Sequence, residues 1–219
     1  QDLYAWNDFQ KNGHRCAIDC SVLVGHYDVS TDTNGKDMTE TALAPEPAPI
    51  RLDIGCGKNK REGFTGIDVM AFDGVDTIHD VRKGIPFADE SVDEVHCSHF
   101  LEHLTGAERV HFINELYRVL KWGAKAVIIT PNWSHACAYG DPTHQWPPMS
   151  EWWPLYTVKA WRDVNGPHTG YTCDFDYGGM NSPDPWLTGR NQEFVQDRMA
   201  HNINSARDLH VHLTKVKRA

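Results

Sequence analysis

The sequence predicts an open, mainly parallel α/β sheet with helices on both faces and an antiparallel C-terminal strand. From residue 50 onward, short apolar runs alternate with turn-forming or helical segments, which is typical of strands in a parallel sheet. One amphipathic segment near the middle of the chain has helical periodicity, and an alternating segment lies near the end. Because ligands of such sheets bind beyond the carboxyl ends of the strands, the residues after each strand are the first candidates for a site.

Each predicted strand is a short apolar run. The five parallel strands are expected at 50–54, 64–69, 75–79, 92–97 and 124–130, and the final strand at 209–213. Residues 171–177 are expected to form a further strand, and residues 190–202 a helix.

The clearest helix lies between the fourth and fifth strands. Thr105 and Glu108 have the spacing of a capping box, which satisfies free backbone N–H groups at a helix start. An apolar face follows, made of Val110, Ile113, Leu116, Tyr117 and Leu120. Gly123 is expected to end this helix.

The composition divides the chain into an arm and one domain. Residues 1–49 are predicted to form an N-terminal arm or lid that ends in a proline-rich linker. Residues 50–219 are predicted to form the domain, with an aromatic-rich insertion at about 132–170 beside its site.

The charge and cysteine usage limit the partners of the chain. The formal charge of −9 disfavours loose binding to nucleic acid. Six scattered cysteines without metal-type spacing indicate reduced thiols and a cytoplasmic location. No signal peptide and no apolar run of bilayer length is visible, so no membrane partner is expected. The oligomeric state is not predicted.

Residues 50–59 are the first candidate site. Gly55 and Gly57 follow a strand that contains Asp53, so the backbone can turn sharply and bring its N–H groups near a ligand. A plain glycine turn has the same pattern. Asp68 lies at the end of the second strand, Asp80 follows the third and Ser98 follows the fourth, which favours a shared pocket for a nucleoside-bearing ligand.

These motifs resemble those of the class I S-adenosylmethionine-dependent methyltransferases, especially a small Methyltransferase-11-like subgroup. The similar segments are 52–57 (LDIGCG), 80–93, 99–104 (HFLEHL) and 115–123. The resemblance is dense over about 50–131 and weaker toward the C-terminus. It implies a Rossmann-like, doubly wound fold, with S-adenosyl-L-methionine as cofactor and S-adenosyl-L-homocysteine as product.

The resemblance also implies roles for single residues. Asp68 would accept hydrogen bonds from the ribose hydroxyls, Asp80 and the Val81 N–H would bind the adenine, and Val69 would pack on it. The full set of expected cofactor-binding residues is Asp53, Gly55, Cys56, Gly57, Lys58, Asp68, Val69, Asp80, Val81, Ser98 and His99.

The sequence departs from the family pattern after the first strand. Lys58 replaces the usual third glycine, and the span from Gly57 to Gly66 is too short for the helix that normally follows. We therefore expect the loop 58–63 to close this wall of the pocket, with Lys58 near the cofactor carboxylate or the acceptor.

The acceptor side is expected after the fifth strand, where aromatic faces suit a planar or sugar-like molecule. The expected substrate-binding residues are Asn132, Trp133, His135, Tyr139, His144, Trp146 and His103. The candidates for a general base are His144, Asp141 and His99, because imidazole titrates near neutral pH. No metal is expected: His99 and His103 have a metal-type spacing, but the sequence supplies no third ligand.

The preferred hypothesis is a methyltransferase that acts on a small molecule such as a sugar or nucleotide. Residues 97–100 lack the motifs of amino- or C5-directed DNA methyltransferases. Two alternatives remain open: a nucleic-acid or protein acceptor, and a protein that binds the cofactor without turnover.

Overall fold

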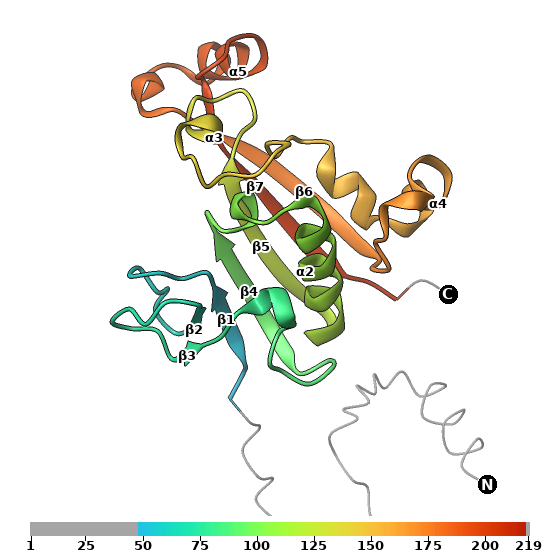
Figure 1. The fold of residues 1–219 in the computed structure, drawn as a ribbon. Coiled ribbons are helices and arrows are strands. Elements are labelled where there is room, and N and C mark those ends of the chain that lie inside the picture. The colour runs from blue at the N-terminus through green and yellow to red at the C-terminus, as the bar shows by residue number, and fades with distance from the viewer. Residues whose placement is uncertain (1–47, 218–219) are drawn as a thin grey trace, which may run out of the picture. The chain divides into compact units, whose positions relative to one another are not determined.

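A seven-stranded sheet forms the centre of the computed structural model, which describes residues 48–217 (Figure 1). The strands are β1 (Arg51–Ile54), β2 (Thr65–Asp68), β3 (Thr77–Ile78), β4 (Val92–Ser98), β5 (Leu120–Pro131), β6 (Phe175–Pro183) and β7 (Ala206–Lys215). Their order is β3-β2-β1-β4-β5-β7-β6. Strands β1 to β5 pair in parallel, whereas β7 runs antiparallel to both β5 and β6. The predicted Rossmann-like sheet with an antiparallel C-terminal strand is confirmed.

Helices and short helical turns connect these strands. The α-helices are α2 (Gly106–Val119), α3 (Cys137–Gly140), α4 (Lys159–Asn165) and α5 (Gln192–His201). The 3₁₀ turns are η1 (Val81–Lys83), η2 (Leu101–His103), η3 (Trp153–Thr157), η4 (Pro167–Thr169) and η5 (Pro185–Leu187). Every helix between residues 48 and 217 is too short or too polar to traverse a bilayer. The predicted N-terminal arm and most of its linker, residues 1–47, lie outside the described residues.

Helix α2 begins as the sequence predicts and ends earlier. The Thr105 side chain accepts from the Glu108 N–H, and the Glu108 carboxylate accepts from the Thr105 N–H, which completes the capping box. The prediction that Gly123 ends the helix is wrong. Leu120 is already extended, buried and paired with Val92, so the sheet takes over there and Gly123 lies inside β5.

The C-terminal elements are close to the predicted ones. Strand β6 begins at Phe175 and continues to Pro183, so only the second half of the run 171–177 is strand. Helix α5 and strand β7 are confirmed. Leu209, Val211 and Leu213 point into the core, as their alternation with polar residues indicates.

The core lies on one face of the sheet. The buried residues of this face are Leu52, Ile54, Val95, Cys97, Ala126, Ile128, Leu209, Val211 and Leu213. Helix α2 packs Phe112, Ile113, Leu116 and Val119 into the same core. Burial of each such side chain stabilises the fold by roughly 1.5–3 kcal/mol.

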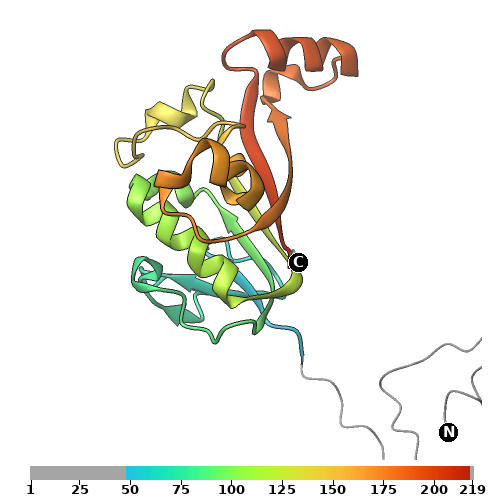
Figure 2. The same cartoon turned by 90° about the vertical axis from the view of Figure 1, so that its right-hand side faces the viewer.

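The two faces of the sheet differ in polarity. Helices α2 and α4 lie on the same side of the sheet, and α5 lies beyond one end of β6 and β7 (Figure 2). Side chains of the opposite face, such as those of His96, Val127 and His212, form one cross-strand row and are partly or fully exposed. The sequence predicts helices on both faces of the sheet, with a loop in place of the usual helix after the first strand. Among residues 48–217, the connection after β1 consists of turns, as predicted.

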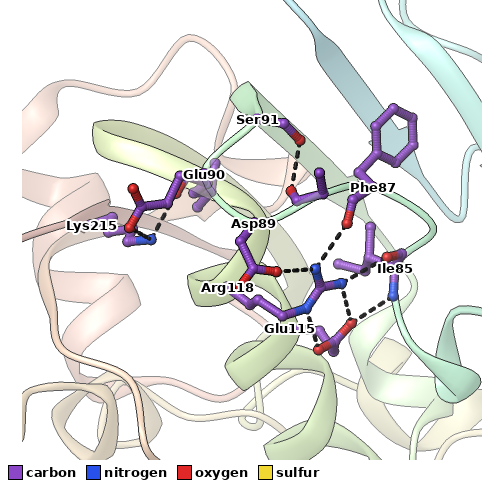
Figure 3. A network of polar contacts seen from close by, with 10 residues as sticks. Ile85, Phe87, Asp89, Glu90, Ser91, Glu115, Arg118 and Lys215 are labelled. Carbon is purple, nitrogen blue, oxygen red and sulfur yellow. Dashed lines mark hydrogen bonds and ion pairs between the residues drawn. The ribbon is translucent and has the colours of Figure 1, made fainter.

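A polar network fixes the loop before β4 to helix α2 (Figure 3). The Arg118 guanidinium donates to the carboxylates of Glu115 and Asp89 and to the carbonyl oxygens of Phe87 and Ile85. Glu115 also accepts from the Ile85 N–H, at 2.8 Å. The hydrogen bonds from Arg118 lower the pKa of the Glu115 carboxyl. The candidate site residues Ser98 and His99 lie at the carboxyl end of β4. This network stabilises the other end of the same strand.

Candidate active site

A cavity of about 370 Å³ opens at the carboxyl ends of β1, β2, β3 and β4. The lining residues are Gly55, Ile67, Asp68, Val69, His79, Asp80, Val81, Arg82, His99, Phe100, His103 and Leu104. All four strand ends contribute to one cavity, as expected for an open parallel sheet. Its volume lies in the range of small-molecule sites.

Gly55 and Phe100 form one wall of this cavity. Gly55 has a φ of +70°, and its N–H donates to the Ile67 carbonyl at 2.8 Å. A Cβ atom at Gly55 would lie 2.7 Å from the Phe100 ring. Phe100 in turn packs edge-on against Phe112 of α2, with ring centroids 5.4 Å apart. Only glycine therefore fits at position 55 without displacing the ring.

The other residues of the glycine motif lie behind the cavity. Asp53 is buried; its carboxylate accepts from the Arg61 N–H at 2.7 Å and contacts His96 Nδ1 at 2.9 Å, so it holds the loop after β1. Cys56 is also buried, and burial raises the pKa of its thiol to about 11. The Lys58 ammonium lies over the Phe72 ring instead of lining the cavity.

Asp68 presents an oriented carboxylate at the end of β2. Its Oδ2 accepts from the Gly57 N–H at 2.9 Å, and its Oδ1 accepts from the Met70 N–H at 2.8 Å. A carboxylate can accept about four hydrogen bonds, so roughly two positions are left for a ligand. Val69 is 56% exposed and adds an apolar surface next to this carboxylate.

Asp80, after β3, is paired with a residue that the sequence reasoning missed. The Arg82 guanidinium donates to both carboxylate oxygens of Asp80, at 2.8 and 3.0 Å, and this pairing lowers the pKa of the Asp80 carboxyl. Arg82 lines the cavity beside Asp80 and buried Val81. The sequence signal for this pair was that Arg82 stands two residues after Asp80.

His99 sits in a left-handed conformation after β4, with a φ of +53°. Its N–H donates to the Ile129 carbonyl, and its Nδ1 lies 3.3 Å from Glu102 Oε1. The contact with Glu102 raises the pKa of the His99 imidazole. Ser98, the preceding residue, is half-buried and does not line the cavity.

Two of the predicted acceptor-side histidines come together at this cavity. His103 lines it, and its ring lies 4.9 Å from the ring of His144 between centroids. Asp141 is linked to His103 through Thr143. Its carboxylate accepts from the Thr143 hydroxyl, whose oxygen is 2.9 Å from His103 Nδ1.

The remaining predicted acceptor residues lie outside this cavity, and one of them lines a second hollow. Asn132 and Trp133 both donate to the Glu151 carboxylate, and Trp133 and Glu151 line a hollow of about 330 Å³ that also contains Asn181. Sequence reasoning missed Glu151 and Asn181, because neither belongs to a motif. Asn132 itself lines neither space, nor do three other predicted residues: His135 is buried against Asp184, and Tyr139 and Trp146 are exposed.

Comparison with known proteins agrees with this arrangement. Residues 58–128 match the family model described as a methyltransferase domain. A S-adenosylmethionine-dependent methyltransferase from Archaeoglobus fulgidus has the same fold, with a TM-score of 0.55 and 22% identity. The match covers 77% of this chain and 87% of that one. Residues 58–128 therefore resemble a methyltransferase domain, and the sheet has the fold of an S-adenosylmethionine-dependent methyltransferase.

Two further solved structures resemble the methyltransferase domain less closely. The YcgJ protein from Bacillus subtilis is 15% identical over 78% of this chain and 94% of its own, with a TM-score of 0.47. Phosphoethanolamine N-methyltransferase 2 from Haemonchus contortus, in complex with phosphomonomethylethanolamine and S-adenosylhomocysteine, is also 15% identical. That match covers 78% of this chain and 50% of the other, with a TM-score of 0.44. No curated protein sequence matches the chain.

Proposed function

We propose that the methyltransferase domain binds S-adenosyl-L-methionine in the cavity at the ends of β1–β4 and transfers its methyl group to a small molecule. The carboxylate of Asp68 carries this proposal. Two backbone N–H groups orient it toward a cavity, and its free acceptor positions suit the two vicinal hydroxyls of a ribose. The second product, beside the methylated acceptor, would be S-adenosyl-L-homocysteine.

The other lining residues suit the remaining parts of this cofactor. Val69 and Val81 supply apolar surface for the adenine ring, and the Asp80 carboxylate lies beside them to accept from its amino group. We place the methionine part near Gly55, where the missing side chain leaves room for close approach to the backbone. Asp53, Cys56 and Gly57 act indirectly in this proposal, because they hold the loop and the Asp68 carboxylate.

Methyl transfer requires little covalent chemistry from the protein. The acceptor atom forms a bond to the methyl carbon as the carbon–sulfur bond breaks, and the sulfonium becomes a neutral thioether. The site contributes alignment and exclusion of water. A hydroxyl or amine acceptor also loses a proton; His99 and His103, which line the cavity, and His144, which contacts His103, are our candidates to accept it. Asp141 would act only through Thr143, as a positioning residue.

A small acceptor is favoured by the size of the site and by charge. The cavity is of small-molecule size, and the formal charge of −9 repels polyanions. A nucleic-acid or protein acceptor is the alternative, as is cofactor binding without turnover.

The four described cysteines, Cys56, Cys97, Cys137 and Cys173, are free thiols, which supports a cytoplasmic location. We keep residues 50–219 as the domain, with an acceptor-side insertion at about 132–170.

Calorimetric titration of the full chain with S-adenosyl-L-homocysteine tests the cofactor site. Asp68→Ala is expected to weaken binding by at least about tenfold, because charged hydrogen bonds contribute roughly 1.5–3 kcal/mol each. Asp73→Ala, an exposed change of the same charge five residues along the chain, is the control and should bind like the parent.

Three results would count against the proposed function. Absence of saturable binding to the parent chain would overturn the cofactor site itself. If the parent binds but transfers no labelled methyl group to any component of broad metabolite extracts, the binder without turnover becomes the better explanation. Transfer to added RNA or protein alone would instead favour the macromolecular acceptor.

A further inference from the structure

We propose that Glu102, His103 and His144 bind a divalent transition-metal ion beside the cofactor cavity. One ligand atom of each residue lies within 4.8 Å of the other two, and His103 also lines the cavity. Two imidazoles and one carboxylate form a donor set that suits ions such as Zn²⁺ or Mn²⁺. This proposal goes beyond methyl transfer from S-adenosylmethionine and does not depend on it.

The Glu102 carboxylate is the strongest indication of a cation-binding site. Glu102 is only 4% exposed, and neither of its carboxylate oxygens has a hydrogen-bond partner among the described residues. Its ion-pair candidate among the described residues is His99, whose Nδ1 lies 3.3 Å from Oε1. Burying a carboxylate without hydrogen bonds costs free energy. A bound cation would stabilise the Glu102 carboxylate, which has no hydrogen-bond partner among the described residues.

The buried guanidinium of Arg109 is near the Glu102 carboxylate but does not hydrogen-bond to it. Its guanidinium donates to backbone carbonyls only: those of Leu101, Glu102, Gln145 and Pro147. The Gln145 N–H also donates to the Glu102 carbonyl, at 2.8 Å. These bonds clamp the segment around His144 onto η2, and they bring His144 to residues that lie about forty positions earlier in the sequence.

The hydrogen bonds of both histidines leave one nitrogen of each ring for a metal. His144 Nδ1 lies 3.1 Å from the Ala138 carbonyl oxygen, which can only accept, so Nδ1 carries the proton. His103 Nδ1 contacts the Thr143 hydroxyl, whose own hydrogen is donated to Asp141, so this Nδ1 is also the donor. In the neutral rings the lone pair is therefore on Nε2. Metal-binding histidines typically donate their second nitrogen in this way.

Three protein ligands leave coordination positions open. A tetrahedral site with bonds of about 2.1 Å holds its ligand atoms roughly 3.4 Å apart, so the side chains need to move inward by about 1 Å. An open position next to the cavity suits an oxygen-bearing ligand, namely water or a hydroxyl group of the acceptor.

Metal titration of the full chain tests this site directly. The chain, freed of metal with a chelator and dialysed, is titrated by calorimetry with Zn²⁺ and, separately, with Mn²⁺. We expect one equivalent of one of these ions to bind, and Glu102→Gln and His144→Ala to raise its dissociation constant at least about tenfold. His168→Ala, which removes an exposed histidine outside the cluster, is the matched control and should bind like the parent.

A second readout and the variants decide the outcome. Co²⁺ should give a visible absorption spectrum in the parent that Glu102→Gln and His144→Ala lose, while circular dichroism confirms that both variants are folded. Glu102→Gln preserves the shape of the side chain if His144→Ala fails to fold. No saturable binding to the parent, or binding unchanged in the folded variants, would overturn the site; in the first case Glu102 is merely the partner of His99. Titration with S-adenosyl-L-homocysteine is a separate measurement, so its failure leaves this proposal untouched.

Discussion

Gly55 determines the shape of the cavity more directly than any other residue of the glycine motif. Its positive φ and the 2.7 Å approach to Phe100 are two separate reasons for glycine at this position. Gly63, in the same loop, has a similar φ of +77°, but nothing lies within 4 Å of the place that a Cβ atom would take there. A comparison of substitutions at the two glycines therefore separates the cost of a left-handed backbone from the cost of a steric clash.

We expect Gly55→Ala to destabilise the domain by about 1–3 kcal/mol more than Gly63→Ala, because only the first change displaces a packed ring. Both variants incur the backbone cost of a left-handed alanine, about 1 kcal/mol. Urea unfolding measures the difference, and calorimetry with S-adenosyl-L-homocysteine should show weaker binding for Gly55→Ala only. Equal losses in both variants would mean that Phe100 moves aside freely.

At the scale of elements, Glu115 and Arg118 of α2 link this helix to the loop before β4. Glu115 accepts from both Arg118 and the Ile85 N–H, and its side chain is only 16% exposed (Figure 3). Because Arg118 lowers the pKa of Glu115, folding favours the ionised carboxylate. This stabilisation is present above the unfolded pKa of about 4.3 and is lost as the pH falls through the lower folded value.

Glu115→Gln should therefore destabilise the domain by about 1 kcal/mol at neutral pH, and this difference from the parent should shrink below about pH 4. Urea unfolding across a pH series measures the difference. Glu62→Gln changes an exposed carboxylate in the loop after β1 and should leave the stability unchanged at every pH. A Glu115→Gln effect that stays constant down to acid pH would show that the ionised carboxylate is not the stabilising form.

At the scale of the whole molecule, tertiary packing separates the four thiols that the structure describes between residues 48 and 217. Cys56, Cys97 and Cys173 are buried, and burial raises the pKa of Cys173 to about 12. Cys137 is exposed at the start of α3. Because the thiolate is the reactive species, exposure favours reaction at Cys137, and the raised pKa of Cys173 disfavours reaction there.

We expect iodoacetamide near pH 8 to alkylate Cys137 well before Cys56, Cys97 or Cys173, whose labelling should require unfolding. Peptide mapping by mass spectrometry follows each cysteine separately, so reaction at residues outside the described region does not interfere. Denaturant supplies the control, since all thiols should then react. Rapid native labelling of Cys173 would mean that the core under α2 and β6 opens far more readily than its burial implies.

Local patterns in the sequence were sufficient for much of the fold. The capping box at Thr105 and the alternation in β7 act within a few residues, so they could be read without the tertiary structure. Gly123 was misjudged for the opposite reason. Pairing of Leu120 with Val92 of the distant strand β4 ended the helix first.

The sequence by itself determined the class of fold, the acids at the strand ends and the missing helix after β1, because strand ends of a parallel sheet share one edge. Only the tertiary structure decided which acceptor-side residues meet. It separated Trp133 from the cavity and placed His144 beside Glu102 and His103. The path of residues 132–147 depends on long-range contacts such as those of Arg109, and no local pattern encodes where such a segment docks.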